Sequence, residues 1–125
     1  MATTTLTGSN FEKTVQDNDI VLVDFWAAWC GPCRQFGPTF EKAAAANPDI
    51  VFGKVDTEAE QALAQAANIS SIPMLMAFRE GILVFAQPGA LPAQALDQVI
   101  TAVRGLDMDE VRASVAAEQS AQSDS

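Results

Sequence analysis

Residues 20–33 read IVLVDFWAAWCGPC, and this stretch decides the fold because a strand pattern passes directly into a helix pattern. Its first seven residues are almost continuously apolar and rich in β-branched side chains, which is typical of a strand covered on both faces. A helix is expected to begin around 31–33, since proline is tolerated in a first helical turn, where its missing N–H group would have no partner. The apolar spacing predicts that this helix runs to about Ala46, with a kink at Pro38.

The rest of the chain alternates between helix and strand periodicities, which is typical of an α/β domain. We predict strands at 50–55, 74–78 and 82–85, and helices at 11–15, 58–67 and 92–105. Glu80-Gly81 separates the last two strands and predicts a hairpin. Parallel strands joined by a helical crossover and followed by a hairpin give a mixed sheet covered on both faces. The expected fold class is therefore α/β, with three layers around a mixed central sheet, and it occupies residues 1–105.

Residues 106–125 are expected to form a separate acidic piece, because they carry five acidic residues against one arginine. Asp107 and Glu110 have the spacing of a capping box, in which two side chains satisfy free N–H groups at a helix start. We expect a helix from about Met108 to Glu118, followed by a disordered tail. A solubilising appendage is the preferred interpretation, and a partner-docking helix is the alternative, since charge runs are usually solvated.

The composition bounds the function of these 125 residues, of which 49% are hydrophobic. The net charge of −9 disfavours nucleic-acid and anionic-membrane binding, both of which need Lys and Arg to neutralise phosphates. The absence of histidine excludes Cys–His and Ser–His–Asp catalysis and every histidine-ligated metal. No signal peptide and no membrane-spanning run is recognisable, so we expect a cytoplasmic protein.

Both cysteines lie in one C-x-x-C motif, Cys30-Gly31-Pro32-Cys33, at the passage from strand to helix. This spacing lets two sulfur atoms meet at disulfide distance, and the free N–H groups of the first helical turn stabilise a thiolate on Cys30. Cys30 is therefore predicted to be an exposed nucleophile and Cys33 a shielded resolving thiol. The alternatives are half of a zinc site, for which two more soft ligands are lacking, and a pair of inert core thiols.

The chain resembles the thioredoxin family over about residues 6–105. The resemblance rests on VLVDFWA at 21–27, WCGPC at 29–33, Ile72-Pro73 before a strand, and GAL at 89–91. It implies a thioredoxin-like fold and a disulfide reductase without a bound cofactor, expected to be a monomer. It also implies that thioredoxin reductase, using NADPH, recharges the cysteine pair, and that the clients include peroxiredoxins and ribonucleotide reductase.

Asp24 stands in the middle of the strand at 20–26, where ionisation of a buried carboxylate is costly. Burial would raise its pKa and make it a usable acid or base near neutral pH, whereas an outward-facing Asp on a half-exposed strand is the alternative. By the resemblance, Asp24 takes the proton from the resolving thiol, and Lys54 interacts with Asp24. The alternative for Lys54 is a solvated lysine at a strand end.

A docking surface for clients is implied by the same resemblance. It would consist of Trp29, Gly31, Pro32, Ile72, Pro73, Gly89 and Ala90 around Cys30. Base rates favour a trans peptide bond before Pro73, but Ile72-Pro73 resembles the cis-proline loop of the family. Met74 replaces the usual threonine after this proline, which leaves the substrate range and the local packing open. For Trp29 and Ile72, the alternative is an ordinary place in the core.

Two other functions compete with a reductase. One is an oxidant or isomerase on the same fold, which Gly-Pro between the cysteines and the missing signal peptide disfavour. The other is a binding module in which the thiols are incidental, and a Cys30→Ser, Cys33→Ser double variant that keeps full biological activity would favour it.

Overall fold

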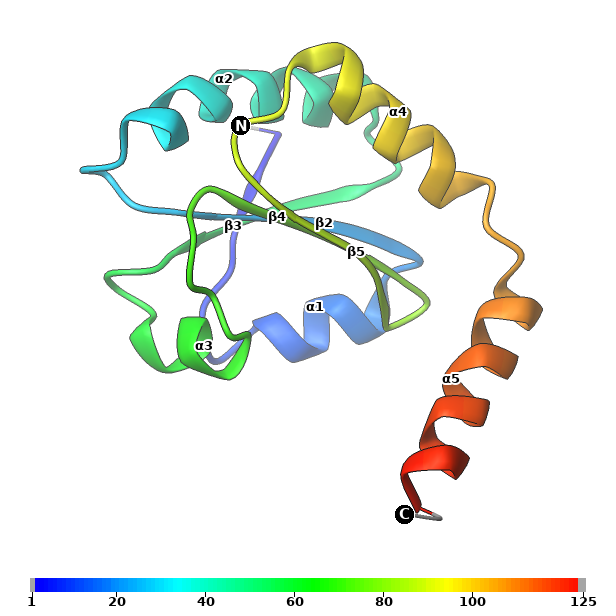
Figure 1. The fold of residues 1–125 in the computed structure, drawn as a ribbon. Helices are drawn as coiled ribbons and strands as arrows, with labels where there is room; N and C mark the ends of the chain where they lie inside the picture. The colour runs from blue at the N-terminus through cyan, green and yellow to red at the C-terminus, as the bar shows by residue number, and fades with distance from the viewer. Residues whose placement is uncertain (1, 124–125) are drawn as a thin grey trace.

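The computed structural model describes residues 2–123 and confirms the predicted α/β fold, with a mixed sheet between two helical layers. In chain order the elements are β1 (Thr4–Thr5), α1 (Phe11–Asp17), β2 (Ile20–Trp26), α2 (Gly31–Ala46), β3 (Val51–Asp56), α3 (Gln61–Ala66), β4 (Met74–Arg79), β5 (Ile82–Pro88), α4 (Ala93–Arg104) and α5 (Met108–Ser123). The strands are ordered β1-β3-β2-β4-β5 in the sheet. β1 and β2 pair with β3 in parallel, whereas β2–β4 and β4–β5 are antiparallel pairs. Figure 1 shows α2 and α4 on one face of this sheet and α1 and α3 on the other.

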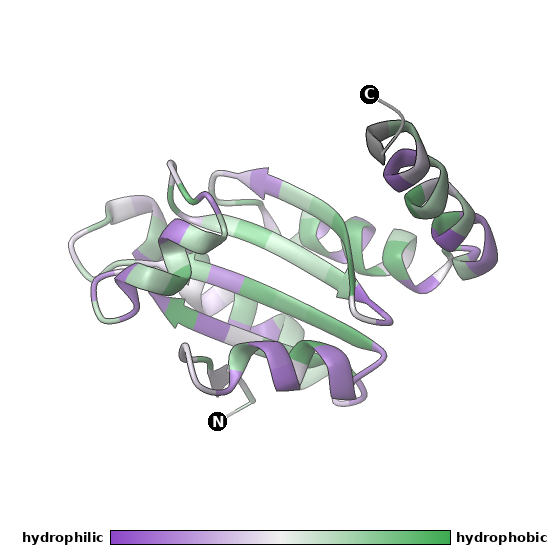
Figure 2. Ribbon diagram, turned by 90° about the horizontal axis from the view of Figure 1, so that it is seen from below, coloured by the Kyte–Doolittle hydropathy of each residue, from purple (hydrophilic) through white to green (hydrophobic). Residues whose placement is uncertain are grey.

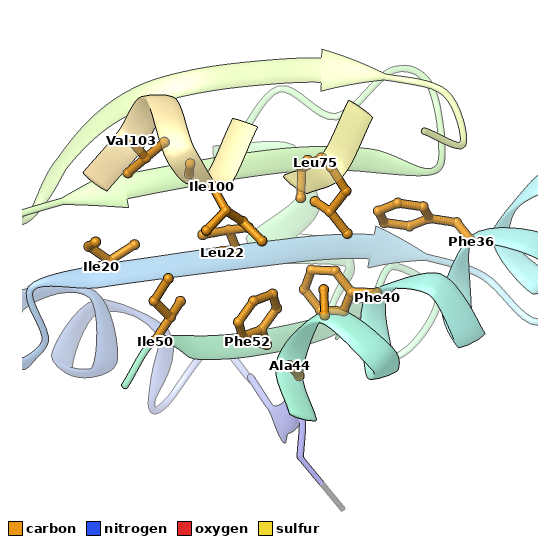
Figure 3. Close-up of a cluster of buried hydrophobic side chains, with 13 residues drawn as sticks. Ile20, Leu22, Phe36, Phe40, Ala44, Ile50, Phe52, Leu75, Ile100 and Val103 are labelled. Atoms are coloured by element: carbon orange, nitrogen blue, oxygen red, sulfur yellow. The ribbon is translucent and has the colours of Figure 1, made fainter. Parts of the chain in front are cut away.

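The central strand β2 is buried along almost its whole length, as its apolar sequence predicts. Because side chains alternate across a strand, Ile20 and Leu22 face α2 and α4, whereas Val21 and Val23 belong to the core beneath α1 and α3. Figure 3 shows Leu22 between the aromatic side chains of α2 and the aliphatic side chains of α4. The same alternation assigns Asp24 to the face that α2 covers.

Turn conformations and the hydrogen bonds that hold them set some element boundaries, and these differ from the boundaries that the sequence pattern predicts. α3 begins at Gln61 and not near Glu58, because Asp56 Oδ1 accepts hydrogen bonds from the N–H groups of Glu58 and Ala59 and holds a turn. At the hairpin, Glu80 and Gly81 both have positive φ, at 52° and 80°, which is the backbone of a type I′ turn. The turn supports the predicted pairing of β4 with β5, although β5 runs on past its expected end to Pro88.

The C-terminal helix α5 begins at Met108, as expected, but continues to Ser123, past the expected end of the helix at Glu118. Asp107 Oδ1 caps it by accepting from the N–H groups of Asp109 and Glu110, at 3.1 and 3.3 Å. Helical structure thus extends through most of the expected disordered tail, of which 124–125 lie outside the described residues.

Several contacts hold the end of α4, the segment after it and the first turns of α5 to the β4–β5 hairpin. Arg79 Nη1 donates to the carbonyl oxygen of Val103 at 2.7 Å and to that of Leu106 at 3.4 Å. Arg112 forms an ion pair with Glu80 in the β4–β5 turn, and Met108 is buried. Figures 1 and 2 both show α5 running away from the three layers, and the colours of Figure 2 show hydrophilic and hydrophobic stretches mixed along it.

Replacement of Gly53 on β3 by alanine is expected to destabilise the fold. A Cβ atom there would lie 2.7 Å from Leu6 Cγ and closer still to Leu6 Cδ1, and Leu6 is fully buried. Gly53→Ala should therefore lower the free energy of unfolding by about 1–3 kcal/mol, the usual cost of overpacking. Urea unfolding measures this change, with Gly105→Ala as the control because the nearest atom to its new Cβ would be Thr101 O at 3.5 Å. Equal free energies of unfolding for the two variants would contradict the expected clash of the new Cβ atom with Leu6.

We propose that the domain ends at Gly105 and that α5 contributes stability rather than activity. Truncation after Gly105 should lower the free energy of unfolding by about 2 kcal/mol, because the burial of Met108 is lost. The disulfide-reducing turnover expected from the resemblance should, for the folded fraction, stay within about twofold of that of the full chain. Arg112→Gln is the matched control for the half-exposed ion pair with Glu80 and should cost under about 1 kcal/mol. A tenfold loss of turnover with unchanged circular dichroism would show that α5 contacts a partner.

Candidate functional site

The two cysteines lie where the C-terminal end of β2 leads into α2. Cys30 is the N-cap residue of α2, and Cys33 lies in its first turn. The two residues form a disulfide, with their Cα atoms 5.2 Å apart, inside the usual range for this bond. Ala27 packs with the pair and is itself fully buried. The C-x-x-C pattern thus placed both sulfur atoms correctly, but it contained no signal for Ala27.

The expected difference in exposure between the two cysteines is wrong for the oxidised pair, since Cys30 is 5% exposed and Cys33 4%. The difference lies in their surroundings instead. Cys30 Sγ accepts a hydrogen bond from the N–H group of Cys33 at 3.2 Å and lies 3.8 Å from the carbonyl oxygen of Ile72. Cys33 lines a groove along α2. The helix N-terminus therefore acts on the sulfur of Cys30, where a donated hydrogen bond stabilises negative charge.

Asp24 is fully buried, which excludes the alternative of an outward-facing strand residue. Neither carboxylate oxygen has a hydrogen-bond partner among the described residues. Burial raises the pKa of Asp24 from 3.8 to about 7, and the positive charge of Lys54 opposes this rise without cancelling it. The side chain is therefore able to exchange a proton near neutral pH.

Lys54 is the residue paired with Asp24 in the register of β2 and β3. Its ammonium group lies 5.2 Å from the centre of the Trp26 ring, a distance typical of a cation–π contact. Lys54 is half-buried and, like Cys33, lines the groove along α2. The structure thus brings Lys54, Trp26 and Cys33 to one groove next to the buried carboxylate.

The predicted docking residues come from three segments that meet around Cys30. Ile72 packs against the cysteine pair, and the Ile72–Pro73 peptide bond is cis. The N–H group of Gly89 donates to the carbonyl oxygen of Pro73 at 2.8 Å, which brings the segment of Gly89 and Ala90 next to this loop. Trp29 is 66% exposed and so does not belong to the core.

The loop after Cys30 is also accessible, since Gly31 is half-buried and Pro32 is exposed. Sequence reasoning missed Glu58, whose carboxylate accepts from Trp29 Nε1 at 2.8 Å and so fixes the orientation of the indole ring. No local pattern links these two positions, which are far apart along the chain. Met74 packs into the core beneath α1 and α3, so the departure from the usual threonine changes that core.

The comparisons with known proteins agree with this geometry. The family model named Thioredoxin matches residues 2–102. The chain belongs to the thioredoxin family. The Streptomyces coelicolor protein named as thioredoxin 2 is 66% identical over 118 residues, which are 94% of this chain and 88% of that protein.

Solved structures also resemble the chain. A mutant thioredoxin of Halobacterium salinarum is 34% identical, with a TM-score of 0.76 over 82% of this chain and 91% of its own. A structure from work on the thiol resolving mechanism of yeast mitochondrial 1-Cys peroxiredoxin via glutathione/thioredoxin systems is 30% identical, with a TM-score of 0.74 over 79% of this chain and 93% of its own. The Cys30–Cys33 pair of this thioredoxin is therefore a redox-active disulfide, and the chain is a protein disulfide oxidoreductase that works by thiol–disulfide exchange.

Neither a membrane helix nor a metal centre is evident in the part of this thioredoxin that the structure describes. None of the helices within residues 2–123 has the length and apolar character needed to cross a bilayer. Over the same residues, no three of the Cys, Asp and Glu side chains gather closely enough to hold a metal ion.

Asp24→Asn is expected to stabilise the fold at high pH and not at low pH. The folded pKa of about 7 lies above the unfolded value of 3.8, so Asp24 costs no stability below pH 3.8 and an increasing amount as the pH rises to about 7. A difference of about three pKa units corresponds to roughly 4 kcal/mol, from which the buried and unsatisfied amide of the variant subtracts a part. Because the amide cost does not depend on pH, urea unfolding should show a gain of about 2–3 kcal/mol at pH 8 and a loss of about 1 kcal/mol at pH 4.

Asp49→Asn is the matched control, because Asp49 is exposed and its hydrogen bonds from Arg104 lower its pKa. This variant should gain nothing at pH 8. If Asp24→Asn and the wild type had the same free energy of unfolding at pH 8, ionisation of Asp24 in the folded protein would not lower its stability.

Proposed function

We propose that the chain is a protein disulfide reductase in which Cys30 is the nucleophile and Cys33 the resolving thiol. The observation that carries this assignment is the hydrogen bond from the N–H group of Cys33 to Cys30 Sγ at 3.2 Å. It supports Cys30 as the sulfur whose anionic form the start of α2 stabilises.

The reaction begins with the reduced pair. The Cys30 thiolate attacks one sulfur of a client disulfide, which forms a mixed disulfide and releases the other client sulfur as a thiolate. Cys33 then loses its proton and attacks Cys30 Sγ, which releases the second client thiolate and forms the Cys30–Cys33 disulfide. Two electrons pass to the client, and the dithiol of the protein is oxidised.

Asp24 and Lys54 act on the second step in this proposal. Asp24 accepts the proton of Cys33, since its pKa of about 7 lets it take up a proton near neutral pH. Lys54 limits the rise in that pKa, because its positive charge favours the ionised carboxylate. Without this opposing charge, Asp24 would stay protonated to higher pH and would be a poorer acceptor.

The docking surface would hold the client while the disulfides exchange. Ile72 packs beside the disulfide, and the exposed indole ring of Trp29 offers an apolar contact. An extended client segment could pair with free backbone groups of the Ile72–Pro73 loop, as peptides do at strand edges.

We propose that thioredoxin reductase returns electrons from NADPH to the pair, and that the clients include peroxiredoxins and ribonucleotide reductase. The peroxiredoxin work in which a related structure was determined supports the first client class. The protein would act as a monomer in the cytoplasm, where thiols are kept reduced.

Reduction of insulin disulfides tests the proposed function directly. With NADPH and a thioredoxin reductase, the protein should make insulin precipitate and consume NADPH, whereas the Cys30→Ser, Cys33→Ser double variant should do neither. Failure of the wild-type protein with dithiothreitol in place of the reductase would overturn the reductase assignment. Failure with the reductase alone would overturn only the proposed electron source.

The order of attack is tested by trapping. Cys33→Ser should accumulate a mixed disulfide with client proteins, because Cys30 attacks but nothing resolves the product. Cys30→Ser should trap almost none, since the remaining thiol lacks the hydrogen bond at the helix start. Non-reducing gels followed by mass spectrometry give the measurement, and equal trapping by both variants would defeat the assignment.

A further inference from the structure

The positive charges of the chain are distributed in an unexpected way. Acidic residues outnumber Lys and Arg by 16 to 7, so each cation has carboxylates available. Four of the seven form ion pairs, and these are Lys13, Arg79, Arg104 and Arg112. Within residues 2–123, the other three, Arg34, Lys42 and Lys54, make no ion pair within 4.0 Å.

These three cations line a single groove of about 700 Å³ along α2. Its other walls are mostly small or apolar and consist of Trp26, Ala27, Ala28, Cys33, Gly37, Pro38 and Ala45. Among the described residues, Glu41 is the one carboxylate that lines it, and Thr3 Oγ1 donates a hydrogen bond to this group at 2.6 Å. Asp24, whose carboxylate acts on Lys54, adds a second negative charge beside the groove when it ionises. The local charge is therefore about +2 with Asp24 protonated and about +1 with it ionised, in a chain whose net charge is −9, and apolar walls strengthen such a local field.

The cations reach the groove from different directions. Arg34 and Lys42 are eight residues apart on α2, which is about 12 Å along a helix axis. Lys54 enters from β3, and its Nζ would lie 3.9 Å from a Cβ atom at Gly37, between the other two along the helix. Arg34 uses Nη1 to donate to the carbonyl oxygen of Ala28, which leaves other guanidinium N–H groups for a ligand.

We infer that this groove is a binding site for small organic phosphates. A phosphate monoester carries a charge of about −2 and three strong acceptor oxygens. These match Arg34 and Lys42, which form no ion pair within the described residues, together with the half-buried Lys54, whose charge also acts on Asp24. The apolar walls suit a flat or apolar body attached to the phosphate, as in most ligand pockets. The inference goes beyond the proposed function, since it assigns a ligand to a groove that none of the docking residues around Cys30 lines within the described residues, although Cys33 and Lys54 of the proposed reaction do line it.

The test uses the full oxidised chain and adenosine monophosphate as the probe. Titration at constant ionic strength, followed by ¹H–¹⁵N correlation spectra, should give saturable shifts at the amides of groove residues such as Ala28, Arg34 and Lys54. Adenosine should give no such shifts, and inorganic phosphate should bind more weakly than the nucleotide. Equal binding of adenosine and the nucleotide would overturn the inference, and so would shifts that grow linearly without saturation.

Charge variants supply the second arm of the test. Lys42→Gln and Arg34→Gln should each weaken nucleotide binding about fivefold, the effect expected from one exposed charged contact. Lys13→Gln is the matched control, because it changes the net charge equally but removes a cation on α1 that is paired with Asp17. An equal loss of affinity in all three variants would show a general charge effect and overturn the site.

Discussion

The rest of the structure depends on the position of β2 between β3 and β4. Its residues are in register with β3 on one side, from Val21 to Trp26, and with β4 on the other, from Ile20 to Phe25. Because hydrogen bonds hold both edges of this strand, its end cannot shift relative to the sheet. α2 begins a few residues later, so the place of its free N–H groups, and with it the place of Cys30, is fixed by the centre of the sheet.

The same strand carries the most costly side chain of the fold. Asp24 is a carboxylate without a hydrogen-bond partner among the described residues, and it lies on a strand whose other side chains are apolar. A hydrophobic residue of similar size would make a more stable core at neutral pH. Lys54, the nearest cation by register, offsets only part of this cost, since its ammonium group lies over the Trp26 ring. A costly group kept in this position is the pattern expected where function opposes stability.

The elements that the sequence predicts correctly are determined by residues within or directly next to them along the chain. The strand at 20–26 and the helix at 31–46 follow from apolar spacing, from proline in a first turn and from the Asn-Pro that ends the helix. The start of α3 could not be found in this way, because the Asp56 side chain holds the preceding residues in a turn. Apolar periodicity does not register a side-chain hydrogen bond of this kind.

The features of the site also divide into those that local sequence predicts and those that depend on tertiary packing. The C-x-x-C spacing places two sulfur atoms at one helix start, but the nearly equal burial of Cys30 and Cys33 depends on Ile72 and Ala27 packing around them. The contact of Trp29 with Glu58 likewise joins segments that only the folded sheet brings together. Resemblance to a family supplied the docking residues, because nothing in their spacing along the chain indicates that they meet.

The two sulfur atoms of the disulfide are almost equally buried but face different surfaces of the protein, and this bears on how the second step of the proposed reaction can run. Cys30 Sγ lies near the carbonyl oxygen of Ile72, at the surface that a client would cover. Cys33 and Lys54 line the groove along α2, which shares no residue with that surface within 2–123. In the proposed reaction, a docked client would therefore leave the groove open, and the proton that Cys33 loses could reach solvent on that side. An anion held by Lys54 would lie on this same route, so any ligand of the groove would act on resolution of the mixed disulfide rather than on capture of the client.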